Sequence, residues 1–190
     1  MKLGNDTQNW GALSITLHWL VALLVIGQWT LGLVMGEFVK DLELKFNLFQ
    51  LHKSFGFLIF VLMILRLVWR LTQPVPALPA HMKPHERRLS HFSHWGFYVL
   101  LLAMPVAGWI SAATAKIIVP TRIFGLFTLP NPFGPRPELH EFAEETHELL
   151  AWVLLALLVL HVAAALKHHV IDRDELLARM LPGLVRPGAR

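Results

Sequence analysis

The chain has 190 residues, of which 55% are apolar and only 16% are charged, and it carries a formal net charge of +4. Together with a mean hydropathy of +0.51, this composition is typical of an integral membrane protein and excludes a soluble binding module. Because the chain contains no cysteine, disulfides and metal or cluster sites built on thiolates are excluded as well.

Four apolar runs are each close to the length, about 20 residues, that a helix needs to cross a bilayer. They cover residues 13–34, 51–71, 91–113 and 147–166. The first run is too long for the core of a signal peptide and no small-residue cleavage site follows it, so we expect it to persist as a helix. Since backbone that faces lipid must satisfy its own hydrogen bonds, the sequence predicts an all-α, integral membrane four-helix bundle that forms one domain over residues 1–190.

The joins between the runs are polar or rich in proline. The sequence TQPVPALPAHMKPHERR follows the second run and is typical of a loop. Residues 114–146 join the third and fourth runs, and their second half is too polar and too rich in proline to span. After the fourth run, residues 170–182 are predicted to form a short amphipathic helix on the membrane surface.

Eleven of the 17 Lys and Arg residues lie on one side of the predicted membrane when the N-terminus is placed inside. This excess predicts that both termini are cytoplasmic. It also accounts for the net charge, so we expect no nucleic-acid partner. The eleven residues are Lys2, Arg66, Arg70, Lys83, Arg87, Arg88, Lys167, Arg173, Arg179, Arg186 and Arg190.

Two histidines on the last run give the sharpest functional signal. His147 and His161 are fourteen residues apart, and fourteen steps of about 100° fall only about 40° short of four full turns, so both imidazoles share one helix face. At about 1.5 Å per residue they are about 21 Å apart along the axis, which is most of a hydrocarbon core of about 30 Å. One therefore lies near each membrane surface.

His18 and His52 occupy depths that match these two. His18 lies near the inner end of the first run, level with His161, and His52 begins the second run outside, level with His147. A low-spin b haem needs two imidazoles on opposite faces of the porphyrin, and facing helices provide them. A single intramembrane histidine is often satisfied by a hydrogen bond or by snorkelling, but four at two matched depths predict two pairs of axial haem ligands.

Five segments together form a recognisable pattern: ITLHWLVALLVIGQW, LHKSFGFLIFVLMILRLVWR, HFSHWGFYVLLLAMPVAGW, HELLAWVLLALLVLHVAAALKHH and the trailing DELLARMLP. Through these segments the sequence resembles the bacterial cytochrome b561 family over about residues 15–182. That family consists of four-helix inner-membrane proteins with two b haems, and it is similar to the cytochrome b subunits of membrane-bound hydrogenases. The resemblance implies that His18 and His161 bind the iron of the inner haem and that His52 and His147 bind the iron of the outer haem.

Further residues are candidates for contacts to the haems or to a quinone. Gly56 is one turn after His52, and because it has no side chain it would allow either a porphyrin or a neighbouring helix to approach the backbone closely. Arg66 shares the His52 face at the inner end and is placed to pair with haem propionates or to snorkel. His168 lies on the same helix face as His161. It is a candidate for binding ubiquinone, which the resemblance supports; the alternative is a solvated interfacial side chain. His91 and His94 are candidates for propionate or quinone contacts or for spare ligands.

The predicted function is electron transfer across the inner membrane, to or from the quinone pool. Its most specific form is oxidation of superoxide outside coupled to reduction of ubiquinone inside, which the resemblance implies for some family members. Lys53, Lys116 and Arg122 are placed to focus an anion onto the outer haem. Five glutamates on the same side oppose this steering: Glu138, Glu141, Glu144, Glu145 and Glu148.

Two alternatives remain. The nearer is a cytochrome b subunit that accepts electrons from a periplasmic dehydrogenase or hydrogenase, with which it would copurify. The more distant is a metal transporter that uses the same histidines. It is disfavoured because transporters usually place acidic or sulfur ligands at the membrane midplane, and no Asp, Glu or Cys lies deep in the four runs.

Overall fold

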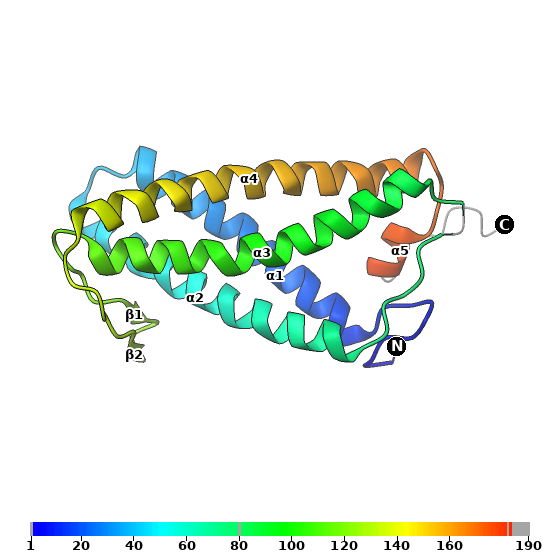
Figure 1. Cartoon of the computed structure of the whole chain (residues 1–190), viewed down its shortest axis with the longest axis horizontal. Helices are drawn as coiled ribbons and strands as arrows, with labels where there is room; N and C mark the ends of the chain where they lie inside the picture. The colour runs from blue at the N-terminus through cyan, green and yellow to red at the C-terminus, as the bar shows by residue number, and fades with distance from the viewer. Residues whose placement is uncertain (1, 80, 182, 184–190) are drawn as a thin grey trace. The chain divides into compact units, whose positions relative to one another are not determined.

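The computed structural model describes residues 2–79, 81–181 and 183, and Figure 1 shows its helices and strands. Four helices dominate: α1 (Ala12–Leu33), α2 (Leu42–Thr72), α3 (Pro84–Thr114) and α4 (Pro137–Val170). Each is long and apolar enough to cross a membrane. The all-α membrane class is therefore confirmed. Arg186 and Arg190 of the predicted inner side, and Pro182 of the predicted surface helix, lie outside the described residues.

Three of the four long helices, α2, α3 and α4, extend beyond their apolar runs because local capping signals set their ends. The Asp41 carboxylate accepts the Leu44 N–H at 2.7 Å, which caps α2 well before its apolar run begins. Both α3 and α4 begin with a proline, Pro84 and Pro137, whose missing N–H has no cost in the first turn. Hydropathy alone does not detect these polar helix ends.

The chain forms two compact units, and each long helix contributes a segment to both. The first unit comprises the described residues of Met1–Trp19, Leu65–Val99 and Val153–Arg190, and the second comprises Leu20–Ile64 and Leu100–Trp152. In both units many large apolar side chains are exposed, among them Leu23, Val99 and Leu149. Such a surface is expected where lipid takes the place of water.

The predicted surface helix at residues 170–182 is shorter than expected. Of these residues beyond the end of α4, only α5 (Leu176–Met180) is helical. Arg173 adopts a positive φ of 54°, which is incompatible with a continuous α-helix between α4 and α5. Asp174 then accepts the Leu176 N–H at 3.0 Å. The Trp19 indole donates to the Met180 carbonyl at 2.7 Å and fastens the end of α5 within the first unit.

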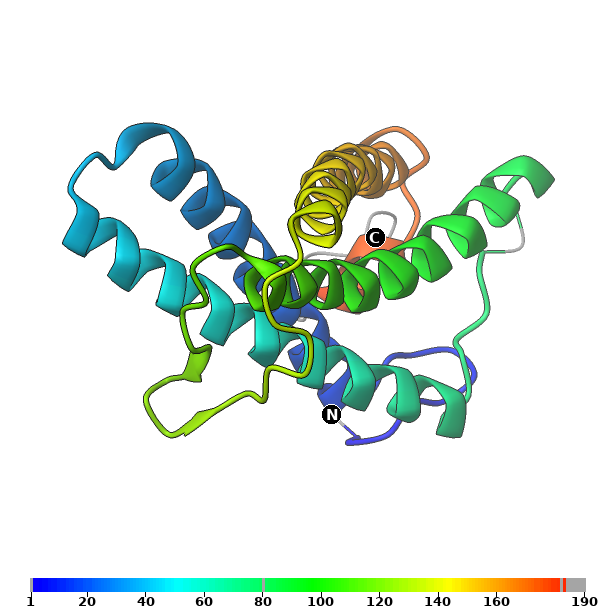
Figure 2. The same cartoon turned by 60° about the vertical axis from the view of Figure 1, so that its left-hand side comes forward.

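In the second unit, α1 continues into a π-helical turn, Val34–Phe38, and the connection between α3 and α4 carries a small hairpin. Its strands, β1 (Arg122–Ile123) and β2 (Phe127–Thr128), are antiparallel, with Arg122 opposite Thr128. Figure 2 shows this hairpin, in yellow-green, beside the cyan part of α2. The Ser54 hydroxyl of α2 fastens it, since it accepts the Phe124 N–H at 3.0 Å.

Candidate functional site

His52 of α2 and His147 of α4 face each other in the second unit. Their ring centroids are 6.2 Å apart and their planes are inclined by 78°. Both side chains are half-buried. The structure thus brings together the two histidines that depth and sequence resemblance paired.

The two imidazoles of this pair differ in their hydrogen bonding at Nδ1. His147 donates from Nδ1 to the Met104 carbonyl of α3 at 3.0 Å, which fixes the tautomer with a lone pair on Nε2. The Nδ1 of His52 is buried and has no hydrogen-bond partner among the residues that the structure describes. A buried polar atom of this kind is costly unless it is satisfied by a group absent from the chain itself.

Two glycines make room for these rings. A Cβ at Gly108 of α3 would lie 3.0 Å from both Cε1 and Nδ1 of His147, and a Cβ at Gly32 of α1 would lie 3.4 Å from Cε1 of His52. Side chains at these positions would crowd the imidazoles. The sequence pattern singled out neither glycine, because the contact depends on which helices pack together.

Gly56, the glycine singled out from sequence, borders a side chain of α1. A Cβ there would meet Gln28 Nε2 at 3.5 Å, which is an ordinary contact. The same Nε2 donates to the His52 carbonyl at 2.8 Å, while Gln28 Oε1 is buried and has no partner within the described part of the chain. Gln28 therefore braces the backbone of His52, and a direct role of Gly56 beside a porphyrin stays a prediction.

In the first unit, His18 of α1 and His161 of α4 form the second pair. Their ring centroids are 6.4 Å apart with planes inclined by 57°. His94 of α3 also approaches His161, with centroids 5.9 Å apart, and Phe97 packs its edge against the same ring at 5.2 Å. The structure therefore offers His94 as a third imidazole at this site.

Arg66 of α2 points into the same site. It donates to His18 Nδ1 at 3.0 Å and lies over the ring of Tyr98, with its guanidinium carbon 5.9 Å from the centroid. Arg70 lies 5.9 Å from the same centroid and 5.9 Å from that of Trp95. Within the described part of the chain, neither arginine has a carboxylate partner. Two half-buried cations beside one aromatic ring are well suited to an anionic group from a ligand.

Both pairs fit a bis-imidazole haem. Imidazole–metal bonds are about 2 Å long, so two imidazoles on opposite sides of one metal atom have centroids about 6 Å apart once the half-widths of the rings are added. The observed separations of 6.2 and 6.4 Å agree with this value. The His52 Nδ1, the glycines beside the rings and the two arginines, which have no carboxylate partner among the described residues, are each consistent with a large cofactor bearing carboxylates.

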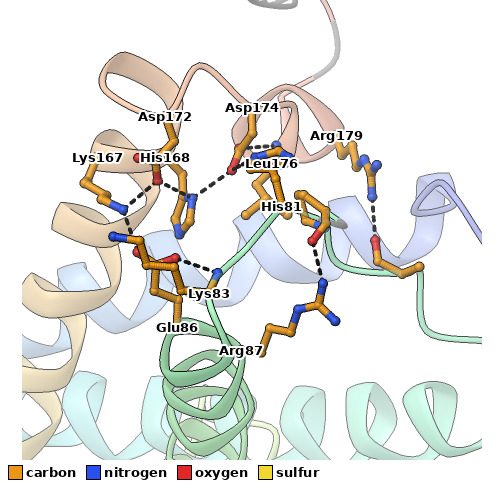
Figure 3. A network of polar contacts seen from close by, with 12 residues as sticks. His81, Lys83, Glu86, Arg87, Lys167, His168, Asp172, Asp174, Leu176 and Arg179 are labelled. Carbon is orange, nitrogen blue, oxygen red and sulfur yellow. Dashed lines mark hydrogen bonds and ion pairs between the residues drawn. The ribbon is translucent and has the colours of Figure 1, made fainter.

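His168 lies in a polar network at the end of α4 in the first unit (Figure 3). Its Nδ1 is 2.7 Å from an Asp174 carboxylate oxygen and 2.9 Å from one of Asp172. His168 is only 9% exposed and the Asp174 side chain only 1%. Donation from Nδ1 to Asp174 leaves Nε2 as the atom that can exchange a proton with a ligand.

The same network contains three groups that could hold a metal ion: Glu86, His168 and Asp172. However, the Lys167 ammonium lies 2.6 Å from a carboxylate oxygen of Glu86 and 2.6 Å from one of Asp172. The lysine already supplies the cation between these carboxylates. The geometry therefore favours a structural ion-pair cluster over a metal site.

The charged residues predicted to steer a donor are all in the second unit. Lys116 and Arg122 are exposed and Lys53 is half-buried. The five glutamates between Glu138 and Glu148 are all exposed. Both signs of charge are thus available on this part of the surface.

Comparison with known sequences gives concordant matches. The sequence profile described as prokaryotic cytochrome b561 matches residues 9–183. Cytochrome b561 homolog 2 of Escherichia coli (strain K12) is 35% identical over 182 residues, which cover 95% of each chain. A protein of Yersinia pestis named probable superoxide oxidase CybB is 30% identical over 92% of this chain and 97% of its own length. Cytochrome b561 homolog 1 of Escherichia coli (strain K12) is 27% identical over 88% of this chain and 94% of its own length.

Proposed function

This chain belongs to the prokaryotic cytochrome b561 family and is a haem-binding electron-transfer protein of the bacterial membrane; we propose that it carries two b haems, one between His18 and His161 and one between His52 and His147. The ring separations near 6 Å carry the proposal. Each bound haem would supply one-electron redox chemistry. The chain's own residues supply the ligands, hold their tautomers and set the local charge.

For the specific reaction we propose oxidation of superoxide coupled to reduction of ubiquinone. Two superoxide ions each lose one electron and leave as O₂, while one ubiquinone takes up two electrons and two protons and becomes ubiquinol. The similarity to a relative named probable superoxide oxidase supports this reaction. Lys53 and Lys116 would draw the anion towards the His52–His147 pair. We retain the prediction that this side is periplasmic and that both termini are cytoplasmic.

Reduction of the quinone needs a proton source, and His168 is the proposed one. Its Nε2 would donate a hydrogen bond and then a proton to a quinone oxygen, while Asp174 holds Nδ1. Lys167 and the carboxylates of Glu86 and Asp172 link this imidazole to the aqueous surface. Asp174 thereby acts as a positioning residue.

The test uses purified protein in lipid nanodiscs with a steady enzymatic source of superoxide. We expect superoxide to reduce the haem absorbance and a short-chain ubiquinone to reoxidise it, with two O₂ released per quinol. Superoxide dismutase, added as a control, should abolish the reduction. Haems that stay oxidised under superoxide would exclude this reaction while leaving the two-haem proposal in place.

The second candidate function is a cytochrome subunit that accepts electrons from a periplasmic redox protein. The exposed glutamates at the start of α4 favour it, because five carboxylates over Glu138–Glu148 would repel superoxide and attract a cationic protein surface. In that case a partner should copurify in mild detergent. If a protein is the donor, the double replacement Glu141→Gln and Glu145→Gln should slow reduction of the haems by that protein. If superoxide is the donor, the same replacement should speed reduction of the haems by superoxide.

We expect Arg66→Gln to lower the reduction potential of the His18–His161 haem by an amount on the order of tens of millivolts. Loss of a nearby positive charge stabilises the oxidised, more positive form. A neutral imidazole that binds a metal through Nε2 carries its proton on Nδ1 and cannot accept a hydrogen bond there. In the haem-bound protein Arg66 would therefore leave His18 Nδ1 and bind a haem carboxylate instead. A redox titration should show that the reduction potential of the His52–His147 haem is unchanged. The control is Arg136→Gln, because Arg136 is an exposed arginine on the α3–α4 connection.

We expect His168→Gln to slow quinone reduction by about 10²-fold, the usual contribution of a general acid. Asp174→Asn should give a smaller loss, since the amide oxygen can still accept from Nδ1 but carries no charge. In both variants superoxide should reduce the haems at the rate of the unmodified protein. His85→Gln, an exposed histidine near the start of α3, is the matched control, and equal losses in all three variants would remove His168 from the reaction.

A further inference from the structure

The first half of the α3–α4 connection is unusually apolar for an extramembrane loop. Residues 115–129 read AKIIVPTRIFGLFTL and contain two basic residues and no acidic residue. The acidic residues of this region begin only at Glu138. This composition differs from that of a solvated loop and is typical of a segment at a membrane surface.

The β1–β2 hairpin within this segment is fastened to a membrane-crossing helix. The ring of Phe124 packs on Phe55 of α2 at 5.2 Å, and that of Phe127 packs on Phe57 at 5.8 Å. The apolar run of α2 begins at Leu51, so at 1.5 Å per residue Phe57 lies about 9 Å along it. The hairpin therefore lies alongside a part of α2 that is within the bilayer boundary.

Several backbone polar groups of the hairpin are paired, which lowers the cost of placing it in a lipid environment. The Leu126 N–H donates to the Ile123 carbonyl at 2.9 Å. The Phe124 N–H donates to Ser54 Oγ at 3.0 Å, and the Ser54 hydroxyl lies 3.1 Å from the Arg122 carbonyl. This pairing permits the positive φ of Phe124, 49°, in a tight turn.

The side chains at the tip face outward and are apolar. At the tip Leu126 is 81% exposed, and Ile117, which precedes the hairpin, is 80% exposed, whereas Ile123 is only 2% exposed. We propose that residues 117–128, here called the hairpin anchor, insert into the headgroup and upper acyl region of the membrane. The lipid-facing surface of α2 would then continue without interruption onto Phe124, Leu126 and Phe127.

A pocket of about 430 Å³ between the hairpin anchor and α2 adds a site for one phospholipid headgroup. Arg122 lines it, is exposed and has no carboxylate partner among the residues that the structure describes. Gln50 also lines it, and its Nε2 donates to the Pro120 carbonyl at 2.9 Å, which holds the connection against α2. A phosphodiester in the pocket would accept hydrogen bonds from the Arg122 guanidinium.

Because the natural chain has no cysteine, single-cysteine variants can carry one nitroxide label each. We would label Leu126→Cys and Ile117→Cys in vesicles of phosphatidylethanolamine and phosphatidylglycerol, with Glu145→Cys as the aqueous reference and Leu23→Cys as the lipid reference. Power saturation with O₂ and with a water-soluble nickel chelate compares the lipid and water exposure of each label. Haem absorbance and gel-filtration elution show which variants are folded.

We expect the Leu126 and Ile117 labels to favour O₂ over the nickel chelate, as the Leu23 label does, and the Glu145 label to show the reverse. Labels at both anchor positions that behave like Glu145 would overturn the proposal, whether water or a protein partner covers the hairpin. Native mass spectrometry tests the pocket: one phospholipid should stay on the unmodified chain and on Arg136→Gln and be lost from Arg122→Gln. Equal retention by both variants would overturn the headgroup site.

Discussion

Replacing His161 with alanine is expected to remove one b haem from each chain and to leave the other in place. His161 is the imidazole against which His18, His94 and Phe97 all pack in the first unit. His52 and His147 face each other in the second unit, so the His52–His147 haem does not depend on His161 as a ligand. Loss of one axial ligand removes half of the metal–protein bonds at that site. Haem extracted as its pyridine complex and divided by chain concentration gives the ratio.

The matched variants His18→Ala and His94→Ala decide which imidazole opposes His161. The 6.4 Å pair with His18 predicts that His18→Ala also loses one haem and that His94→Ala keeps both. The reverse pattern would assign the ligand to His94, whose ring is 5.9 Å from His161. A full complement of haem in His161→Ala would contradict any ligand role for this residue.

Replacing Gly108 with alanine is expected to disturb the His52–His147 site alone. The new methyl group would lie 3.0 Å from two atoms of the His147 ring, where carbon contacts are favourable at about 3.5–4.0 Å. Overpacking of this kind usually costs about 1–3 kcal/mol, so we expect haem at this site to be bound on the order of tenfold or more weakly. Haem loss to apomyoglobin, followed for each absorbance component, measures the effect.

Gly27→Ala is the control for this experiment, because a Cβ at Gly27 of α1 would meet nothing within 4 Å. Alanine is favoured over glycine inside a helix by about 1 kcal/mol, so both variants should gain helix stability. Only the Gly108 variant should lose haem. Equal haem retention by the two variants would mean that the His147 ring moves aside freely and that Gly108 does not shape the site.

The four helices and the two histidine pairings could be predicted because both depend on regular repeats along the chain. Apolar runs of membrane length identify spans, and a fourteen-residue interval places His147 and His161 on one face. The helix ends were less accessible to hydropathy. The polar beginning of α2 depends on the Asp41 cap, and the surface helix is limited to α5 by the conformation of Arg173.

The surroundings of the histidines could not be predicted in the same way. Gly32 and Gly108 touch imidazoles from other helices, and the Met104 carbonyl accepts from His147 across 43 positions of sequence. Such contacts follow from helix packing, which periodicity along one helix does not determine. Arg66 was singled out by its helix face, but its contact with His18 Nδ1 depends on how α1 and α2 pack. Asp174 could not be identified from helix periodicity, because it lies beyond the end of α4 whereas its partner, His168, lies within α4.

The central claim is that each chain holds two b haems between paired histidines, and the most direct test is the haem content of the purified, detergent-solubilised protein. We predict two haems per chain, with a dithionite-reduced minus oxidised spectrum of the b type and low-spin bis-histidine signals in electron paramagnetic resonance. One haem per chain would contradict one of the two pairs. No haem in protein produced with ample haem supply would contradict the ligand assignment of all four histidines.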